Sequence, residues 1–240
     1  MKSWETKNRY KIIRVLAGRS NVFLISKGAK NILVDSSPAN CWKKLDRNLQ
    51  KLGVERLDAL VLTHTHYDHA GNAAKLQDKY NARVIVHRSE GPFLARGEAI
   101  IPKGTNLLGR LLIDRLGKKL APRLTCPPCC PDILVDDALS LADLGFNARI
   151  VHTPGHSPGS QSVVVDDEIA LVGDAMFGIF PGSVFPPFAN DARQMVESWE
   201  KLLATGCRLF LPSHGTEDNR ELLQKDYDKR KGLANPAFSQ

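Results

Sequence analysis

The chain of 240 residues is 42% apolar, which is enough to bury the core of one large α/β domain. Its amino terminus lacks the apolar stretch of a secretory signal, and no later segment approaches the ~20 apolar residues of a membrane-spanning helix. We therefore expect a soluble, cytoplasmic protein. The net charge of +7 would suit a nucleic acid or a membrane surface, but most of the excess lies in residues 103–123, where six basic residues accompany one acidic residue.

Hydrophobic periodicity and turn residues predict alternating strands and helices. In the first half, strands are expected at residues 11–16, 21–26, 31–35, 57–62 and 83–86, and helices at 41–52 and 70–80. In the second half, strands are expected at 148–151, 161–165, 168–172 and 208–211, with a helix capped by Asn190 or Asp191 that ends at Gly206 and a last helix from about Thr216. Asp166 and Asp167 form a hairpin turn. The mixture predicts a layered α/β architecture, and no Gly-, Ser- or Pro-rich linker divides residues 1–240.

Residues 63–71, THTHYDHAG, place three imidazoles and a carboxylate directly after a predicted buried strand. In an extended loop His64 and His66 point the same way, so they can share one metal ion. The chain must then turn, which lets Asp68 and His69 address a second ion. Imidazole and carboxylate are suitable zinc ligands, and the absence of cysteine here favours a catalytic site over a closed structural one.

This H-x-H-x-D-H motif resembles that of the metallo-β-lactamase superfamily, which predicts further ligands at later strand ends. His156 lies in TPGHSPG, Asp174 closes the strand at 169–172, and His214 ends FLPSH. The resemblance implies a four-layer αββα sandwich. It assigns a first metal to His64, His66 and His156, a second to Asp68, His69 and His214, and a bridging role to Asp174.

Three further residues are weighed against the same pattern. Asp35 closes a predicted strand and matches a family position that supports the metal ligands, although capping the strand end is an equal alternative. His87 and His152 are expected to be packing or surface residues rather than ligands.

The ligand set narrows the chemistry that the resemblance implies. Many β-lactam hydrolases of this superfamily lack a bridging Asp at the position of Asp174, and the flavin-linked diiron relatives carry Glu where His66 stands, so both activities are disfavoured. We expect a binuclear hydrolase, with two zinc ions or alternatively iron or manganese, that cleaves a thioester, ester or lactone of a small molecule by attack of a metal-bound hydroxide. Asp68 would both bind metal and pass a proton to the leaving group.

Several alternatives stay open at this point. Hydroxyacylglutathione hydrolases and acyl-lactone hydrolases are the most similar branches, but only residues 216–240 follow Gly215, too few for the helical extension that binds glutathione. A phosphodiesterase or nuclease is supported only by the net charge, because aromatic residues do not interleave the basic segment. A mononuclear-iron sulfur dioxygenase shares the fold and some ligands, and the complete ligand set argues against a non-catalytic binding module.

An insertion at about residues 90–131 separates the two halves of the motif set. Leu108, Leu111, Leu112 and Leu116 form the apolar stripe of a predicted basic helix, which is interpreted as plain packing, a substrate lid, a homodimer contact or a membrane contact. The five cysteines are an odd number, which argues against a disulfide framework. Cys126, Cys129 and Cys130 are expected to be thiols, with a disulfide or an accessory metal as the alternative.

Overall fold

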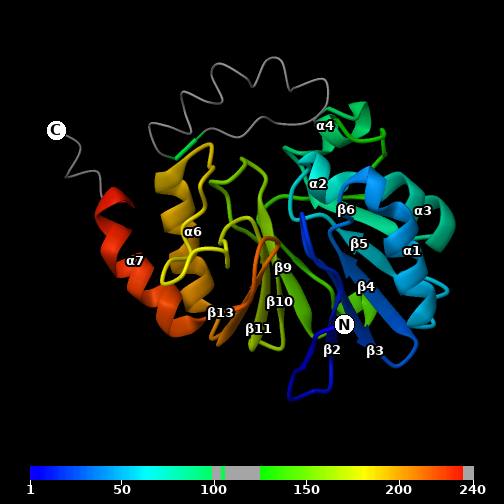
Figure 1. Cartoon of the computed structure of the whole chain (residues 1–240), viewed down its shortest axis with the longest axis horizontal. Helices are drawn as coiled ribbons and strands as arrows, with labels where there is room; N and C mark the ends of the chain where they lie inside the picture. Colours follow the sequence, from blue (N-terminus) through cyan, green and yellow to red (C-terminus); the bar gives the residue numbers. More distant parts are fainter. Residues whose placement is uncertain (99–103, 106–124, 235–240) are drawn as a thin grey trace.

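The computed structural model describes residues 1–98, 104–105 and 125–234. Figure 1 shows two β-sheets packed face to face between two layers of helices. This arrangement confirms the predicted four-layer αββα sandwich. Within the described residues, no helix combines the length and the apolar character that crossing a membrane requires.

The first sheet has seven strands, which lie in sequence order from one edge to the other. They are β1 (Ser3–Glu5), β2 (Lys11–Leu16), β3 (Val22–Lys27), β4 (Lys30–Val34), β5 (Ala59–Val61), β6 (Arg83–His87) and β7 (Ile133–Val135). Pairs up to β4 are antiparallel, whereas β4 to β7 run parallel. The carboxyl ends of these parallel strands therefore meet at one edge. Helices on this side are α1 (Trp42–Lys51), α2 (Tyr67–Ala70), α3 (Ala73–Tyr80) and α4 (Gly91–Arg96), with a short 3-10 turn at Ala39–Cys41.

The second sheet has six strands in the order β13-β12-β11-β10-β9-β8. They are β8 (Ala138–Ser140), β9 (Ala148–His152), β10 (Gln161–Val165), β11 (Ile169–Gly173), β12 (Leu209–Pro212) and β13 (Asp218–Asn219). All pairs are antiparallel except β11 with β12. Helices α6 (Ala192–Ala204) and α7 (Arg220–Ala234) accompany this sheet, and a 3-10 turn lies at Ala142–Leu144.

Alternating burial divides the residues of β4 between two hydrophobic cores. On β4, Ile32 and Val34 pack between the sheets, whereas Leu33 packs on the outer side against Leu45 and Leu49 of α1. This follows from the period of two along a strand. Buried apolar surface stabilises by about 25 cal/mol per Å². The two faces of β4 therefore stabilise its packing between the sheets and its packing against α1.

Helix α6 covers the second sheet and also supports two loops. Asp191 caps it by accepting a hydrogen bond from the Gln194 N–H at 3.0 Å, which agrees with one of the two predicted caps. The fully buried Trp199 packs on the outer face of the sheet. Its indole N–H donates to the carbonyl of Ala175 at 2.7 Å, and the Ser198 hydroxyl donates to that of Pro154 at 2.6 Å. The helix therefore holds the chain segments that follow β9 and β11.

Two predicted elements differ from the structure. The helix expected at residues 70–80 is divided into α2 and α3, because the side-chain amide of Asn72 donates to the carbonyls of Ser36, Ser37 and Pro38 instead of facing solvent. A Cβ at Gly71 would lie 2.4 Å from the Ala39 nitrogen, so this break needs glycine.

The last helix begins at Arg220 rather than at about Thr216. Residues 218–219 pair with β12 as strand β13, and the Asn219 side chain then accepts from the Leu222 N–H at 2.9 Å. The predicted hairpin turn is present, with positive φ at both Asp166 and Asp167, as the two central residues of a type I′ turn require.

The predicted leucine stripe of the insertion lies outside the described residues. The parts that are described touch both halves of the molecule. The Thr105 N–H donates to the carbonyl of Pro187 at 3.1 Å, and the Cys129 N–H donates to that of Leu94 at 3.0 Å. All five cysteines are free thiols, and Cys126 and Cys129 are buried in the core under the first sheet.

A buried carboxylate on β13 predicts a pH-dependent stability. Burial, together with the nearby Glu217 and Asp226 carboxylates, raises the pKa of Asp218 to about 7, and its Oδ2 atom has no hydrogen-bond partner among the described residues. Folding favours the protonated form of Asp218. The stability associated with this neutral side chain is present in full below about pH 4 and is lost as the pH rises through 7. Asp218→Asn should therefore raise the melting temperature by a few degrees at pH 8.5 and much less at pH 5.

Thermal unfolding of the two proteins at both pH values checks this expectation. The exposed Asp78→Asn serves as the control for loss of one surface charge. An equal effect of Asp218→Asn at the two pH values would contradict the assignment.

Candidate metal centre

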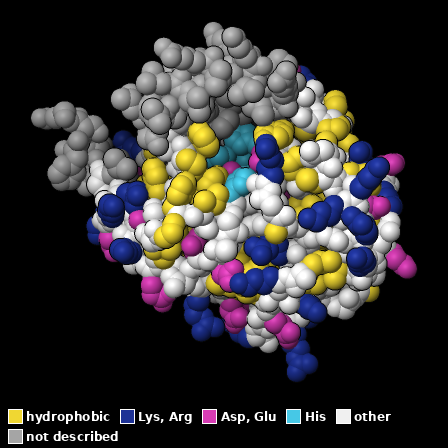
Figure 2. All heavy atoms as spheres, in the orientation of Figure 1, with side chains coloured by type: hydrophobic (Ala, Val, Ile, Leu, Met, Phe, Trp, Pro, Cys, Tyr) yellow, Lys and Arg dark blue, Asp and Glu magenta, His cyan; other side chains and the backbone are white. Residues whose placement is uncertain are grey.

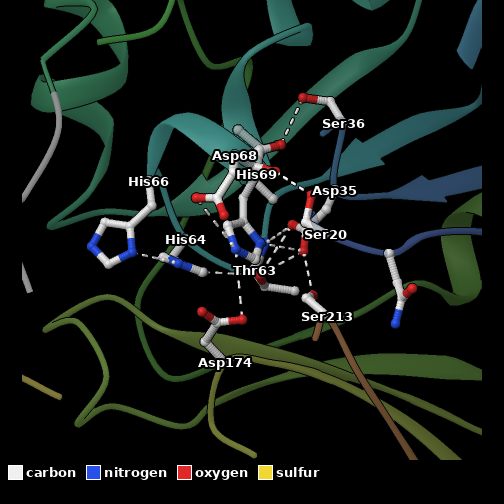
Figure 3. A network of polar contacts seen from close by, with 12 residues as sticks. Ser20, Asp35, Ser36, Thr63, His64, His66, Asp68, His69, Asp174 and Ser213 are labelled. Atoms are coloured by element: carbon white, nitrogen blue, oxygen red, sulfur yellow. Dashed lines mark hydrogen bonds and ion pairs between the residues drawn. The ribbon is translucent and has the colours of Figure 1, made fainter. Parts of the chain in front are cut away.

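The seven predicted ligands come together at one edge of the sandwich, from four loops that follow strands of both sheets. His64, His66, Asp68 and His69 follow β5 of the first sheet. The others follow strands of the second sheet: His156 follows β9, Asp174 follows β11 and His214 follows β12. Figure 3 shows the first loop and Asp174 facing one another across the gap between the sheets.

The two sheets approach closely beside this cluster. Gly173 has φ of +56°, and a Cβ there would lie 2.6 Å from the Thr63 Cβ. The backbone N–H of Gln161 donates to the Thr63 carbonyl at 2.9 Å, and its side-chain amide donates to the Leu62 carbonyl at 2.8 Å. The loop that carries the histidine motif is therefore fixed to the second sheet through its backbone.

Three imidazoles form the first group of candidate ligands. The Nδ1 atom of His66 lies 2.9 Å from Nε2 of His64 and 3.0 Å from Nε2 of His156. All three residues are buried. Burial lowers the pKa of each, and for His64 and His66 the neighbouring imidazoles lower it further. Neutral rings with converging nitrogens are what a metal ion requires of histidine.

Hydrogen bonds on the far side of two rings fix their orientation. Nδ1 of His156 donates to the Phe188 carbonyl at 2.9 Å, so its Nε2 carries the lone pair that faces the cluster. Nδ1 of His64 lies 3.1 Å from the Thr63 hydroxyl oxygen. That hydroxyl contacts the Asp35 carboxylate at 2.9 and 3.0 Å. Its proton is therefore directed to Asp35, and His64 donates to its oxygen.

The second group consists of Asp68, His69 and His214. The carboxylate oxygens of Asp68 lie 3.9 Å from Nε2 of His69 and 3.7 Å from Nε2 of His214. Nδ1 of His69 lies 2.9 Å from the Asp35 carboxylate, which also accepts from the Thr63 N–H and the Ser213 hydroxyl. Asp35 thus contacts a predicted ligand directly, as the first of its two predicted roles requires.

Asp174 lies between the two groups. One of its oxygens is 3.6 Å from Nε2 of His69, and the other is 3.4 Å from Nε2 of His156 and 3.3 Å from Nε2 of His214. Burial acts to raise the pKa of Asp174, but His69, His214 and His156 outweigh it and hold that pKa well below its usual value. The carboxylate is therefore ionised and within reach of both groups.

The charge balance of the cluster fits bound cations. Burial acts to lower the pKa of His69, yet the carboxylates of Asp174, Asp35 and Asp68 outweigh burial and raise it to about 10. Nε2 of His69 and Oδ1 of Asp174 are buried without hydrogen-bond partners among the described residues. A proton on His69 supplies part of the positive charge that a divalent ion would supply, so the donor set and its unpaired atoms suit metal binding.

His87 and His152 lie outside this cluster, as expected. Their rings stack on each other at 4.0 Å, and neither belongs to a group of three candidate metal ligands in the described part of the chain.

Sequence reasoning did not identify Glu90 as a residue that supports the candidate ligands. Glu90, taken only as the start of the insertion, is fully buried and accepts hydrogen bonds from Thr65 and Ser157, which are sequence neighbours of predicted ligands. The available signal was its position just after β6, whose carboxyl end meets the same edge of the sheet as that of β5.

The centre opens to solvent beside apolar side chains. Figure 2 shows histidine side chains at the bottom of a hollow that is bordered on one side by hydrophobic residues. Gly178 pairs with Gly215 and donates to the His214 carbonyl at 2.9 Å, so the next residues, Ile179 and Phe180, which are 52% and 45% exposed, follow directly on the centre. The Phe177 ring lies 4.6 Å from that of His214. Arg19 and Tyr67 contact each other next to Asp68. A substrate would therefore meet both apolar and charged groups.

Comparison with known proteins agrees with this geometry. A model of the metallo-β-lactamase superfamily matches residues 15–214. The chain is 26% identical to the protein named "Probable metallo-hydrolase" of Methanocaldococcus jannaschii over 66% of this chain and 68% of that one. It is 24% identical to the atrochrysone carboxyl ACP thioesterase of Aspergillus fumigatus over 92% of this chain, which spans 61% of that longer protein.

A solved structure extends the likeness to the fold. The archaeal metallo-β-lactamase superfamily protein of Sulfolobus tokodaii superposes with a TM-score of 0.64 at 21% identity, covering 88% of this chain and 80% of that one. Four ligand-bearing loops, a four-layer sandwich and a family match over most of the chain lead to one conclusion: the protein belongs to the metallo-β-lactamase superfamily and is a metal-dependent hydrolase.

Proposed function

We propose that the protein is a binuclear zinc hydrolase that cleaves a thioester, ester or lactone of a small molecule. The observation that carries this proposal is the position of Asp174, whose two oxygens face both groups of candidate ligands. In this assignment His64, His66 and His156 hold the first ion, Asp68, His69 and His214 hold the second, and Asp174 is shared.

Zinc is favoured by the chemistry of the donors. Five imidazoles and two carboxylates without a thiolate match catalytic zinc sites, while iron and manganese accept the same atoms. The ions, when bound, supply a hydroxide at neutral pH and polarise the substrate carbonyl. A mononuclear-iron dioxygenase, the alternative within this fold, needs no second group of ligands and no shared carboxylate.

Asp68 is the carboxylate best placed to meet a substrate. Its side chain is 13% exposed, against 4% for Asp174, and the Ser20 hydroxyl donates to its backbone carbonyl. We assign Asp68 a second role, which is to hand a proton to the departing thiolate or alkoxide. Asp174 is too enclosed by imidazoles for that task.

The hollow around the centre favours an acyl substrate over a phosphodiester. Ile179 and Phe180 offer apolar surface for an acyl portion, and one relative is by name a thioesterase. A phosphodiesterase remains the runner-up, supported by the net charge of +7 and by the ability of two metal ions to hold phosphoryl oxygens.

Metal content and substrate choice test the proposal together. Purified, zinc-loaded protein should contain close to two ions per chain by elemental analysis, because the seven donors complete two sites. A panel of thioesters, lactones and phosphodiesters should show turnover of the first two classes that chelation abolishes. One tightly bound iron with oxygen consumption would select the dioxygenase, and turnover of phosphodiesters alone would select the runner-up.

Removing the shared carboxylate should affect both ions. Asp174→Ala should lower the zinc content below two per chain, weaken each remaining site by at least ~10-fold and reduce turnover by ~100-fold or more. Asp166→Ala is a matched control, since Asp166 is also a buried carboxylate but bonds to Thr6, Asn8 and Asn147 away from the centre. Two tightly bound zinc ions in Asp174→Ala would refute the bridging role.

The proton-transfer role of Asp68 predicts an effect that depends on the leaving group. Asp68→Asn keeps the size of the side chain and should fold normally, but turnover of an alkyl ester or lactone should fall by ~10²–10⁴-fold. An activated aryl ester or a thioester, whose leaving group needs less protonation, should lose much less. Steady-state kinetics with matched substrates measure this difference, and equal losses for all leaving groups would leave Asp68 with metal binding alone.

A further inference from the structure

Glu90 is a buried carboxylate without a basic partner among the ion pairs of the described residues. Its Oε2 atom accepts from the N–H of Thr65 at 3.1 Å and from the Thr65 hydroxyl. Its Oε1 atom accepts from the Ser157 hydroxyl at 2.6 Å and from the Gly159 N–H at 3.2 Å. Four donors thus converge on one side chain, two on each carboxylate oxygen, so its acceptor positions are satisfied although it is buried.

The donors flank the first group of candidate ligands. Thr65 lies between His64 and His66 in the chain, and Ser157 follows His156. The loops that carry them arise from different sheets, so one carboxylate bonds to both arms of the proposed first metal site. A Cβ at Gly159 would lie 2.3 Å from the Glu90 Cγ, which shows how closely the second arm approaches.

A second buried carboxylate performs the corresponding task for the other group. Asp35 contacts His69 directly and accepts from Ser213, the neighbour of His214. Asp35 thereby bonds to both arms of the proposed second site. In the hydrogen bonds recorded for the described residues, Glu90 bonds to neither His69 nor Ser213. Asp35 makes no bond to the His156 arm and reaches His64 only through the Thr63 hydroxyl.

We propose that Glu90 is a positioning residue for the first metal site, which sets the spacing between the His64–His66 arm and the His156 arm. The inference rests on the proposed ligand assignment but not on the substrate. A carboxylate is needed because it only accepts hydrogen bonds. In a glutamine, the NH2 group would face either Thr65 or the N–H of Gly159, and one arm would move away.

Glu90→Gln should lower zinc affinity at the first site by ~10–100-fold, the range seen when an outer partner of metal ligands is lost, and leave the second site near wild type. Asp35→Asn is the comparison variant. Asp35 contacts His69 directly and reaches His64 only through the Thr63 hydroxyl, so this variant should weaken the second site more than the first. Titration of metal-free protein with zinc against a competing chelator gives the two affinities. Cobalt substitution assigns the two affinities, because Co2+ held by three imidazoles and Co2+ held by two imidazoles and the Asp68 carboxylate have different absorption spectra.

Thermal unfolding of the metal-free variants separates positioning from folding. A loss of melting temperature with unchanged zinc affinities would mean that Glu90 is merely structural, and equal weakening of both sites would also overturn the proposal. If Glu90→Gln does not fold, Ser157→Ala removes one of the four bonds and should weaken the first site alone, by a smaller factor.

Zinc affinity and substrate turnover, measured separately, distinguish the role of Glu90 from the proposed hydrolase function. If Glu90→Gln loses zinc affinity at the first site alone while the wild-type protein hydrolyses none of the substrates, the role of Glu90 is supported and the hydrolase proposal is refuted. If Glu90→Gln keeps two zinc ions and wild-type turnover, the hydrolase proposal is supported and the role of Glu90 is refuted.

Discussion

The structure depends on burying carboxylates among imidazoles at the contact between two sheets. Each carboxylate costs several kcal/mol to remove from water unless donors or positive charge surround it. Asp174 meets that requirement through three imidazoles, Asp35 through His69 together with hydroxyl and backbone donors, and Glu90 through hydroxyl and backbone donors. The close packing around these groups needs glycine at position 159, beside Glu90, and at position 173, beside the Thr63 side chain that bonds to Asp35.

The two sheets of the sandwich bring the loops that carry these groups together at one edge. Parallel strands β4, β5 and β6 end at one edge of the first sheet, and β9, β11 and β12 bring three loops to the same place from the second. The core between the sheets, with residues such as Val61 and Leu171, fixes their relative position. Loop side chains can then be placed within a few tenths of an ångström although the loops themselves contain little regular structure.

Sequence reasoning recovered what is encoded locally. The motif at 63–71 could be recognised because its candidate ligands are adjacent in the chain. The amphipathic pattern located α6, and turn chemistry left two candidate caps, of which Asp191 is the one found. The break at Gly71 and Asn72 and the strand β13 could not be foreseen, since both depend on partners distant in sequence. Glu90 was missed for the same reason: its donors lie 25 and 67 residues away. The leucine-rich part of the insertion lies outside the described residues, so its role remains a prediction.

The division of the ligands between the sheets also links the centre to folding. The histidine motif belongs to the first half of the chain, whereas His156, Asp174 and His214 belong to the second, so neither half alone can form either group of candidate ligands. An ion that binds only the assembled pair of halves stabilises the folded chain by mass action, and its binding free energy becomes folding free energy. In the proposed zinc form the centre would therefore also stabilise the contact between the two sheets. In a cell short of metal, the chain would be both inactive and less stable at that contact.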